Sequence, residues 1–305
     1  MTFRTVFSST LTDRGIRNIF VKTRYRKSIP CSKCFRKKIV WVSDKRFRCR
    51  KCWSFGSVTK GTWLERSKGS LRFWYELVWN FVLCHAAHKS SKLMEEDVKV
   101  CWQGYQVIRK ALTQASYRGR KKITGTIELD ESFYGGTFKN LRKQVRQELR
   151  RLGLNKRGGG AKYRKQPVFG IFKRNGKVYL EPIPEAKAKV LSPLITKRIR
   201  VGSDVFSDTG TWYAGLVGLG YVHKTVDHGK QEYVAGDVHI NGLEGFWGLS
   251  KTNMHTYKGI KKKNWLLYLK EMEFRYNNRK LSFDQMVEKI IKILMAYRRK
   301  NFVPY

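Results

Sequence analysis

Two pairs of cysteines constrain the fold of residues 28–60 more tightly than any other feature of the sequence. Cys31 and Cys34 form one C-x₂-C pair, Cys49 and Cys52 form another, and 49 − 34 − 1 = 14 residues separate the pairs. This spacing is typical of a zinc ribbon, in which four thiolates surround one structural Zn²⁺. The short apolar stretch between the pairs cannot bury much core, so bound metal would replace that core. The sequence therefore predicts a small zinc-stabilised β module.

The chain is strongly basic, with 64 Lys and Arg residues against 23 Asp and Glu residues in 305 and a formal charge of +41. Self-repulsion at this charge is severe, so we expect a polyanionic partner, double-stranded DNA. Apolar residues make up 41% of the chain and aromatic residues 13%, which indicates a folded protein rather than a basic tail. No apolar run reaches the roughly 18 residues that a membrane helix needs, so we expect an intracellular protein without a membrane partner.

Composition and periodicity divide the chain into regions. We expect a basic N-terminal arm over residues 1–27, the zinc ribbon over 28–60, a helical DNA-binding domain over 61–118, and an α/β domain over 119–300 with a basic insertion over 137–165. The insertion fits either a disordered surface loop or a loop that contacts DNA.

The helical region has two interpretations. In the first, it is a helix-turn-helix, with Ser90 or Ser91 capping a helix over 93–99 and a second helix over 102–114 that reads DNA. In the second, it is an ordinary helical connector. The predicted DNA contacts of the whole chain are Lys33, Arg36, Arg50, Arg109, Lys110, Arg157 and Lys251, with Gln103 and Gln106 as further base contacts in the helix-turn-helix interpretation.

The α/β domain is predicted from alternating and helical apolar patterns. Strands are expected near 125–134, 167–173, 177–183, 202–207 and 221–226, and helices over 186–199, 209–219, 239–253, 261–278 and 284–299.

Three acids lie at the ends or starts of these predicted elements. Asp130 and Asp208 close apolar-alternating stretches, and Glu244 lies on a helical run with Lys251 seven residues later, on the same face. Two strand-borne aspartates and a helix-borne glutamate supply the hard oxygen ligands that two Mg²⁺ or Mn²⁺ ions need in phosphoryl transfer. Alternatives stay open, because Asp208 could cap a helix. The rival acids are Glu128, Glu131, Asp204, Asp227 and Asp237.

The residues around these acids carry a family resemblance over about residues 28–280. The segments are the cysteine pairs, 128–136 (ELDESFYGG), 207–209 (SDT), 239–247 (HINGLEGFW) and 274–277 (FRYN). On these segments the chain resembles a DDE transposase of a bacterial insertion sequence, from the zinc-ribbon group related to the eukaryotic Merlin elements.

The resemblance implies an RNase H-like catalytic domain in which Asp130, Asp208 and Glu244 hold two Mg²⁺ or Mn²⁺ ions. It also implies a DNA-cutting and joining activity: water cuts at the ends of a mobile element, and the freed 3′-hydroxyl attacks target DNA. Lys251 would hold a terminal phosphate or base. Asn241 is a rival third ligand, although an anionic carboxylate suits a hard cation better.

Two other functions remain as alternatives, a non-catalytic, domesticated sequence-specific DNA-binding protein and a structure-specific nuclease of the same fold. For a transposase we expect a homodimer or a higher oligomer on DNA, in the cytoplasm of a prokaryote and associated with its nucleoid.

Overall fold

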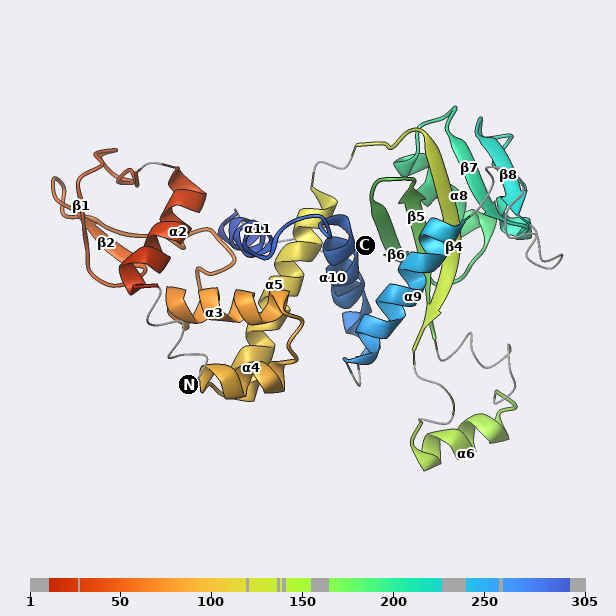
Figure 1. Ribbon diagram of the computed structural model, residues 1–305, viewed down its shortest axis with the longest axis horizontal. Helices are drawn as coiled ribbons and strands as arrows, with labels where there is room; N and C mark the ends of the chain where they lie inside the picture. The colour runs from red at the N-terminus through yellow and green to blue at the C-terminus, as the bar shows by residue number, and fades with distance from the viewer. Residues whose placement is uncertain are drawn as a thin grey trace. The chain divides into compact units, whose positions relative to one another are not determined.

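The structure is a computed structural model that describes residues 11–26, 28–118, 121–135, 138, 141–154, 165–226, 240–257 and 260–296 (Figure 1). The chain forms two compact units. The first unit combines Met1–Arg118 with Lys280–Tyr305, and the second unit is Gly119–Arg279. Within the described ranges, no helix is both long enough and apolar enough to cross a membrane.

The first unit contains a small antiparallel sheet, of strand order β1-β2-β3, and a group of helices. Its elements are α2 (Asp13–Tyr25), β1 (Ile39–Trp41), β2 (Arg46–Cys49), β3 (Phe55–Ser57), α3 (Leu71–Val82), α4 (Ala87–Met94), α5 (Val98–Tyr117) and α11 (Phe283–Met295). Helix α11 contacts α2, α3 and α5, so these four helices form the core of the unit.

The expectation of an arm over residues 1–27 is wrong for α2, which is a packed helix. Thr12 caps it by accepting a hydrogen bond from the Gly15 amide at 3.1 Å. Ile16 and Phe20, one helical turn apart, are fully buried. This apolar pair is surrounded by basic residues in the sequence, so the helical pattern was too short to be recognised.

Helix α11 is also placed differently from expectation, since it packs in the first unit and not in the α/β domain. The Trp63 amide donates to the Leu294 carbonyl at 3.1 Å, and the rings of Trp79 and Phe283 have centroids 4.4 Å apart. The second unit accordingly ends at Arg279 instead of residue 300. The periodicity that predicts a helix says nothing about which core buries its apolar face.

The helices after α3 begin and end at different residues from those predicted. Helix α4 ends where Glu95 adopts a left-handed conformation (φ 53°), and Asp97 starts α5 by accepting from the Lys99 and Val100 amides. Ser90 lies inside α4, where its hydroxyl pairs with the Tyr105 hydroxyl at 2.7 Å. A three-residue turn between two helices is compatible with the helix-turn-helix interpretation.

The second unit is a mixed α/β structure built on one five-stranded sheet, of order β6-β5-β4-β7-β8. Strand β4 is central, antiparallel to β5 and parallel to β7. The elements are β4 (Thr126–Tyr134), α6 (Lys143–Arg151), β5 (Gln166–Lys173), β6 (Val178–Pro182), α8 (Ala188–Arg198), β7 (Asp204–Asp208), η2 (Thr211–Tyr213), β8 (Val222–Val226), α9 (Asn241–His255), η4 (Lys262–Asn264) and α10 (Trp265–Asn277).

The helix expected over 209–219 is wrong. Only the short 3₁₀ turn η2 forms there, followed by turns up to the start of β8. Glycines recur through the segment at 210, 215, 218 and 220, and each glycine disfavours a helix by about 1 kcal/mol relative to alanine.

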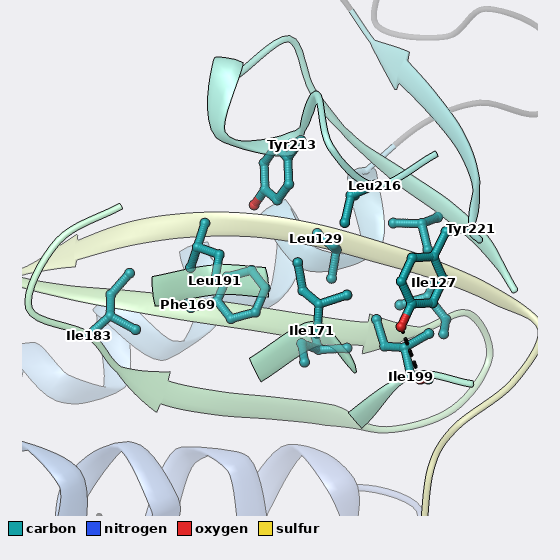
Figure 2. Close-up of a cluster of buried hydrophobic side chains, with 12 residues drawn as sticks. Ile127, Leu129, Phe169, Ile171, Ile183, Leu191, Ile199, Tyr213, Leu216 and Tyr221 are labelled. Atoms are coloured by element: carbon teal, nitrogen blue, oxygen red, sulfur yellow. Dashed lines mark hydrogen bonds between the residues drawn. The ribbon is translucent and has the colours of Figure 1, made fainter. Parts of the chain in front are cut away.

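Alternating residues of the strands face two separate cores. In one core, α8 and the segment after β7 cover Ile127, Leu129 and Ile171 of the sheet (Figure 2). The opposite core packs Val168 and Phe172 against α9 and α10. The period of two along β4 therefore directs Glu128, Asp130 and Ser132 toward the face covered by α9.

Candidate active site

Asp130 and Asp208 lie at the same level of neighbouring parallel strands. The pairs between β4 and β7 run from Thr126–Asp204 to Glu128–Phe206, and Asp130 and Asp208 each lie two residues beyond the last pair. Residues opposite each other in a parallel pair point to the same side of the sheet. The strand register thus directs both carboxylates toward one place.

Asp130 is a partly buried acid beside other acids. Its pKa is raised from 3.8 to about 6, mainly by burial and to a smaller extent by the negative charges of Asp208 and Glu244. The indole of Trp247 opposes this rise by donating a hydrogen bond from Nε1 to Oδ2 at 2.8 Å. Because both charges act on Asp130, these three acids form one electrostatic group.

Glu128 fixes the start of the helix that carries Glu244. Its Oε2 accepts a hydrogen bond from the Leu243 amide, in the first turn of α9, at 2.9 Å. Its other oxygen accepts from Nε of Arg174 at 3.0 Å, and the side chain is almost completely buried. A buried, paired carboxylate at a helix N-terminus is a structural cap, so Glu128 positions α9 and has no oxygen facing solvent.

A glycine makes room for the indole that holds Asp130. Gly170 of β5 lies opposite Asp130 in the strand register. A Cβ atom at this position would lie 2.6 Å from Cζ2 of Trp247 and 3.0 Å from Cδ1 of Leu243. The close approach of α9 to the sheet therefore depends on the missing side chain at residue 170.

Glu131 belongs to the other face of the sheet. The Tyr213 hydroxyl donates to its Oε1 at 2.5 Å, and burial raises the pKa of Glu131 to about 7. The charges of Asp130 and Asp208 contribute to this rise. Glu131 is therefore a second acid with a raised pKa. The sequence shows that it follows Asp130 but does not show that Tyr213 is its partner.

The remaining predicted site residues surround this group. Asp208 accepts a hydrogen bond from the Gly210 amide at 3.0 Å, and Asn241 and Glu244 are both exposed in the first turn of α9. Burial lowers the pKa of Lys251, as does Lys165, whereas the charge of Asp130 raises it. Lys251 is thus within electrostatic reach of Asp130.

Asp204, another rival acid, lies away from the site. Asp204 begins β7, four residues and about 13 Å from Asp208 at 3.3 Å per residue. Asp227 and Asp237 lie outside the described residues.

The donor set fits hard divalent cations, because all three acids offer carboxylate oxygens and repel one another in the absence of positive charge. The oxygen atoms of the three carboxylates do not, however, all lie within 4.8 Å of one another. Among the described residues, the four cysteines are the group whose ligand atoms all lie within 4.8 Å of one another.

Residues 122–277, which span β4 to α10, match the ISXO2-like transposase domain. The chain belongs to this transposase family. The match confirms the resemblance to DDE transposases of insertion sequences and covers the whole sheet with its acids.

Two relatives agree with this family. The transposase is 24% identical over 273 residues to an uncharacterized protein in transposable element ISH50 of Halobacterium salinarum, covering 87% of this chain and 91% of the relative. It is 32% identical over 102 residues to an uncharacterized transposase-like protein of Haemophilus influenzae, covering 33% of this chain and 82% of the relative.

The cysteines of the transposase form the cluster expected of a structural zinc site. The Sγ atoms of Cys31 and Cys52 are 3.5 Å apart, as are those of Cys34 and Cys49. Four sulfurs bound tetrahedrally at about 2.3 Å would be separated by about 3.8 Å, so the cluster fits Zn²⁺. The hydroxyl of Ser54 helps to lower the pKa of Cys31 to about 6, whereas burial and hydrogen bonds to the other cysteines raise the pKa of Cys34 to about 11. In the absence of a cation the four thiols therefore do not all favour the thiolate.

One predicted DNA contact is wrong. Arg109 is 2% exposed, and its guanidinium lies over the rings of Phe81 and Tyr105, so it packs inside the first unit. Gln106 is also buried. Residue types alone could not distinguish the buried face of α5 from its exposed face. A long arginine can bury its methylene groups and stack its guanidinium on aromatic rings.

The other predicted DNA contacts keep their status as predictions. Lys33, Arg36, Arg50, Lys110 and Lys251 are exposed. Arg157 lies outside the described residues. The insertion expected as a loop over 137–165 contains helix α6, none of whose residues is buried.

Proposed function

We propose that the chain is a metal-dependent DNA transposase with an RNase H-like catalytic domain. It cuts DNA at the ends of a mobile element and joins the freed 3′-hydroxyl to target DNA. Asp130, Asp208 and Glu244 would hold two Mg²⁺ or Mn²⁺ ions, and the four cysteines one Zn²⁺. The observation that carries the proposal is the shared electrostatic environment of three acids from two parallel strands and one helix.

The topology supports the RNase H-like assignment. The central strand β4 carries Asp130, and an antiparallel meander on one side and parallel strands on the other continue the sheet. Helix α9 follows the parallel strands and brings Glu244 over the same face as Asp130.

The chain would supply position and charge, and the cations would activate the attacking oxygen and stabilise the leaving oxygen when bound. Trp247 keeps the Asp130 carboxylate oriented and favours its ionised form. Glu128 fixes the helix that presents Glu244. Lys251 would bind a phosphate near the cut end, and no covalent bond between protein and DNA is needed.

Glu244 is the favoured third ligand. Its negative charge acts on Asp130, whereas Asn241 offers only a neutral carbonyl oxygen, which is a weaker ligand for Mg²⁺. Both side chains are exposed in the same helical turn, so the choice rests on charge rather than on position.

A cleavage assay with a matched pair of variants tests the proposal. Asp130→Asn removes a carboxylate charge at the site, and Asp204→Asn makes the same change at the far end of β7. With DNA carrying the element's ends and Mg²⁺, Asp130→Asn should lose cleavage while binding DNA normally, because DNA affinity comes from Lys and Arg. Asp204→Asn should cleave like the wild type.

The rival functions give other results. A non-catalytic DNA-binding protein would bind the ends without cleaving them even as the wild type. A structure-specific nuclease would cleave branched DNA of unrelated sequence and join nothing. Cleavage by Asp130→Asn at the wild-type rate would contradict the assigned site.

A further inference from the structure

One face of the zinc-ribbon sheet exposes aromatic and apolar side chains to solvent. Val40, Arg48 and Phe55 lie opposite one another on β1, β2 and β3. Phe55 is 56% exposed and Val40 is 38% exposed, although both are large apolar residues on a regular strand. Trp53, just before β3, is 61% exposed. These four residues and Arg46 are called the aromatic face.

Arginines stack on both rings of the aromatic face. The guanidinium of Arg48 lies 4.5 Å from the centroid of the Trp53 ring, and that of Arg46 lies 5.4 Å from the Phe55 ring. Such pairs hold the rings in defined orientations and place positive charge beside them. The face thus combines flat π surfaces with cations.

The turn of the second cysteine pair fixes the backbone at Trp53: its amide donates to the Cys49 carbonyl at 3.1 Å, as the amide of Phe35 does to the Cys31 carbonyl after the first pair. Trp53 has φ 57°, in the left-handed region, immediately after the second cysteine pair. Glycine adopts this conformation without steric conflict, whereas a bulky side chain does so at a cost. The turn accounts for this conformation, and the mostly exposed side chain gains little from burial, so its ring is available for a ligand.

The surroundings of the aromatic face are positively charged. Ten Lys and Arg residues and a single acid, Asp44, occur between residues 28 and 62. The carboxylate of Asp44 accepts from the Leu71 amide at 2.7 Å and so caps α3. Beside the face lies a cavity of about 600 Å³, and its charged lining consists of the four cations Lys45, Arg46, Lys60 and Lys68 and the two acids Asp44 and Glu65. A polyanion fits this charge, and a phosphate chain fits a basic groove next to stacking rings.

We propose that the aromatic face binds unpaired DNA bases, which stack on Trp53 and Phe55 while the adjoining basic groove holds their phosphates. Paired bases in a duplex bury their faces against one another, so exposed rings add little to duplex binding. Single strands offer these faces, and aromatic and arginine side chains are the surfaces on which they stack. The inference rests on the proposed function in one respect, because strand cleavage at the element's ends is the source of the unpaired bases.

The test compares single-stranded and duplex binding by the full chain with zinc bound and without Mg²⁺. Fluorescence anisotropy measures the dissociation constants for a labelled oligothymidine and for a duplex of equal length. Trp53→Ala should weaken single-strand binding on the order of tenfold and leave duplex binding within about twofold. Trp53→Phe, which keeps an aromatic surface, should retain most of the single-strand affinity.

A second variant separates stacking from folding. Trp53→Gly removes the ring but suits the left-handed backbone, so the ribbon should fold at least as well, with one equivalent of zinc by metal analysis. It should lose single-strand affinity as Trp53→Ala does. Unchanged single-strand affinity in the Gly variant would overturn the inference, as would an equal loss of duplex affinity. A change in sedimentation without a change in DNA affinity would instead make the face an interface between copies.

The result is independent of catalysis. A wild type that cleaves element ends but shows no effect of Trp53 on single-strand binding contradicts this inference alone. A wild type that binds single strands through Trp53 and never cleaves contradicts the proposed function alone.

Discussion

The hydrogen bond from Trp247 to Asp130 makes a quantitative prediction about the pH dependence of cleavage. Trp247→Phe keeps an aromatic ring in the core but removes the Nε1 donor, 2.8 Å from Oδ2. A hydrogen bond to a charged group contributes about 1.5–3 kcal/mol. This bond stabilises the ionised form, so its loss raises the pKa of Asp130 above its value of about 6. At 1.36 kcal/mol per tenfold change, the new pKa is roughly 7–8.

The consequence is a loss of activity that depends on pH. Near pH 6.5 the wild-type carboxylate is mostly ionised and able to bind a cation, whereas in the variant it is mostly protonated. Cleavage of element ends by the variant should therefore fall by about tenfold near pH 6.5 and recover towards the wild-type rate near pH 8.5. The assay is the single-turnover cleavage rate from about pH 6 to 9 at fixed Mg²⁺.

Trp265→Phe is the matched control, because Trp265 packs in the same core with its ring 5.9 Å from that of Tyr134. It should lower thermal stability without moving the pH profile. If Trp247→Phe reduces the rate by the same factor at every pH, the hydrogen bond does not control the ionisation of Asp130 and the indole serves packing alone.

Three further predictions concern stability and ligands. Cys49→Ser should release zinc and unfold the ribbon, since one missing ligand opens a closed tetrahedral site; metal analysis that finds no zinc in the wild type would contradict the assignment. Gly170→Ala should destabilise the second unit by about 1–3 kcal/mol in chemical denaturation, because the added Cβ meets the buried indole. Gly245→Ala, where a Cβ meets open space on α9, should be neutral or stabilising. Glu244→Gln should abolish cleavage and Asn241→Ala should reduce it less; the opposite order would move the third ligand to Asn241.

The strands of the second unit could be predicted because alternating apolar residues mark both their faces and their ends. The strand expected over 167–173 is β5 at Gln166–Lys173, and that expected over 202–207 is β7 at Asp204–Asp208. Asp208 was recognisable for the same reason as the acid that ends β7, whereas Asp130 lies in the middle of β4 and not at the end of a strand. That these two acids lie at the same level of the sheet could not be predicted, because the parallel register depends on pairing between strands far apart in the sequence.

The partners of the acids were also beyond sequence reasoning. The hydrogen bond from Trp247 to Asp130 exists because Gly170 lets the indole lie against the sheet, a contact between residues far apart in the sequence. The sequence could not distinguish the role of Glu128 from that of Asp130. The distinction depends on the fold, which brings the Leu243 amide at the start of α9 to the Glu128 carboxylate. Arg109 shows the opposite error, since a basic residue on a helix was assigned to DNA although its side chain is buried between rings.

The position of α11 has a consequence for synthesis of the protein. The helices α2, α3 and α5 are translated early, but α11, which packs against all three, follows only after the entire second unit. While the ribosome translates the second unit, the apolar side chains that α11 covers lack that partner. A chain released prematurely before residue 283 would therefore carry all the acids of the candidate active site and yet fail to complete its N-terminal unit. Production of the zinc-ribbon unit by itself should accordingly require residues 280–296 to be joined back to residues 11–118, by a linker or as a separate peptide.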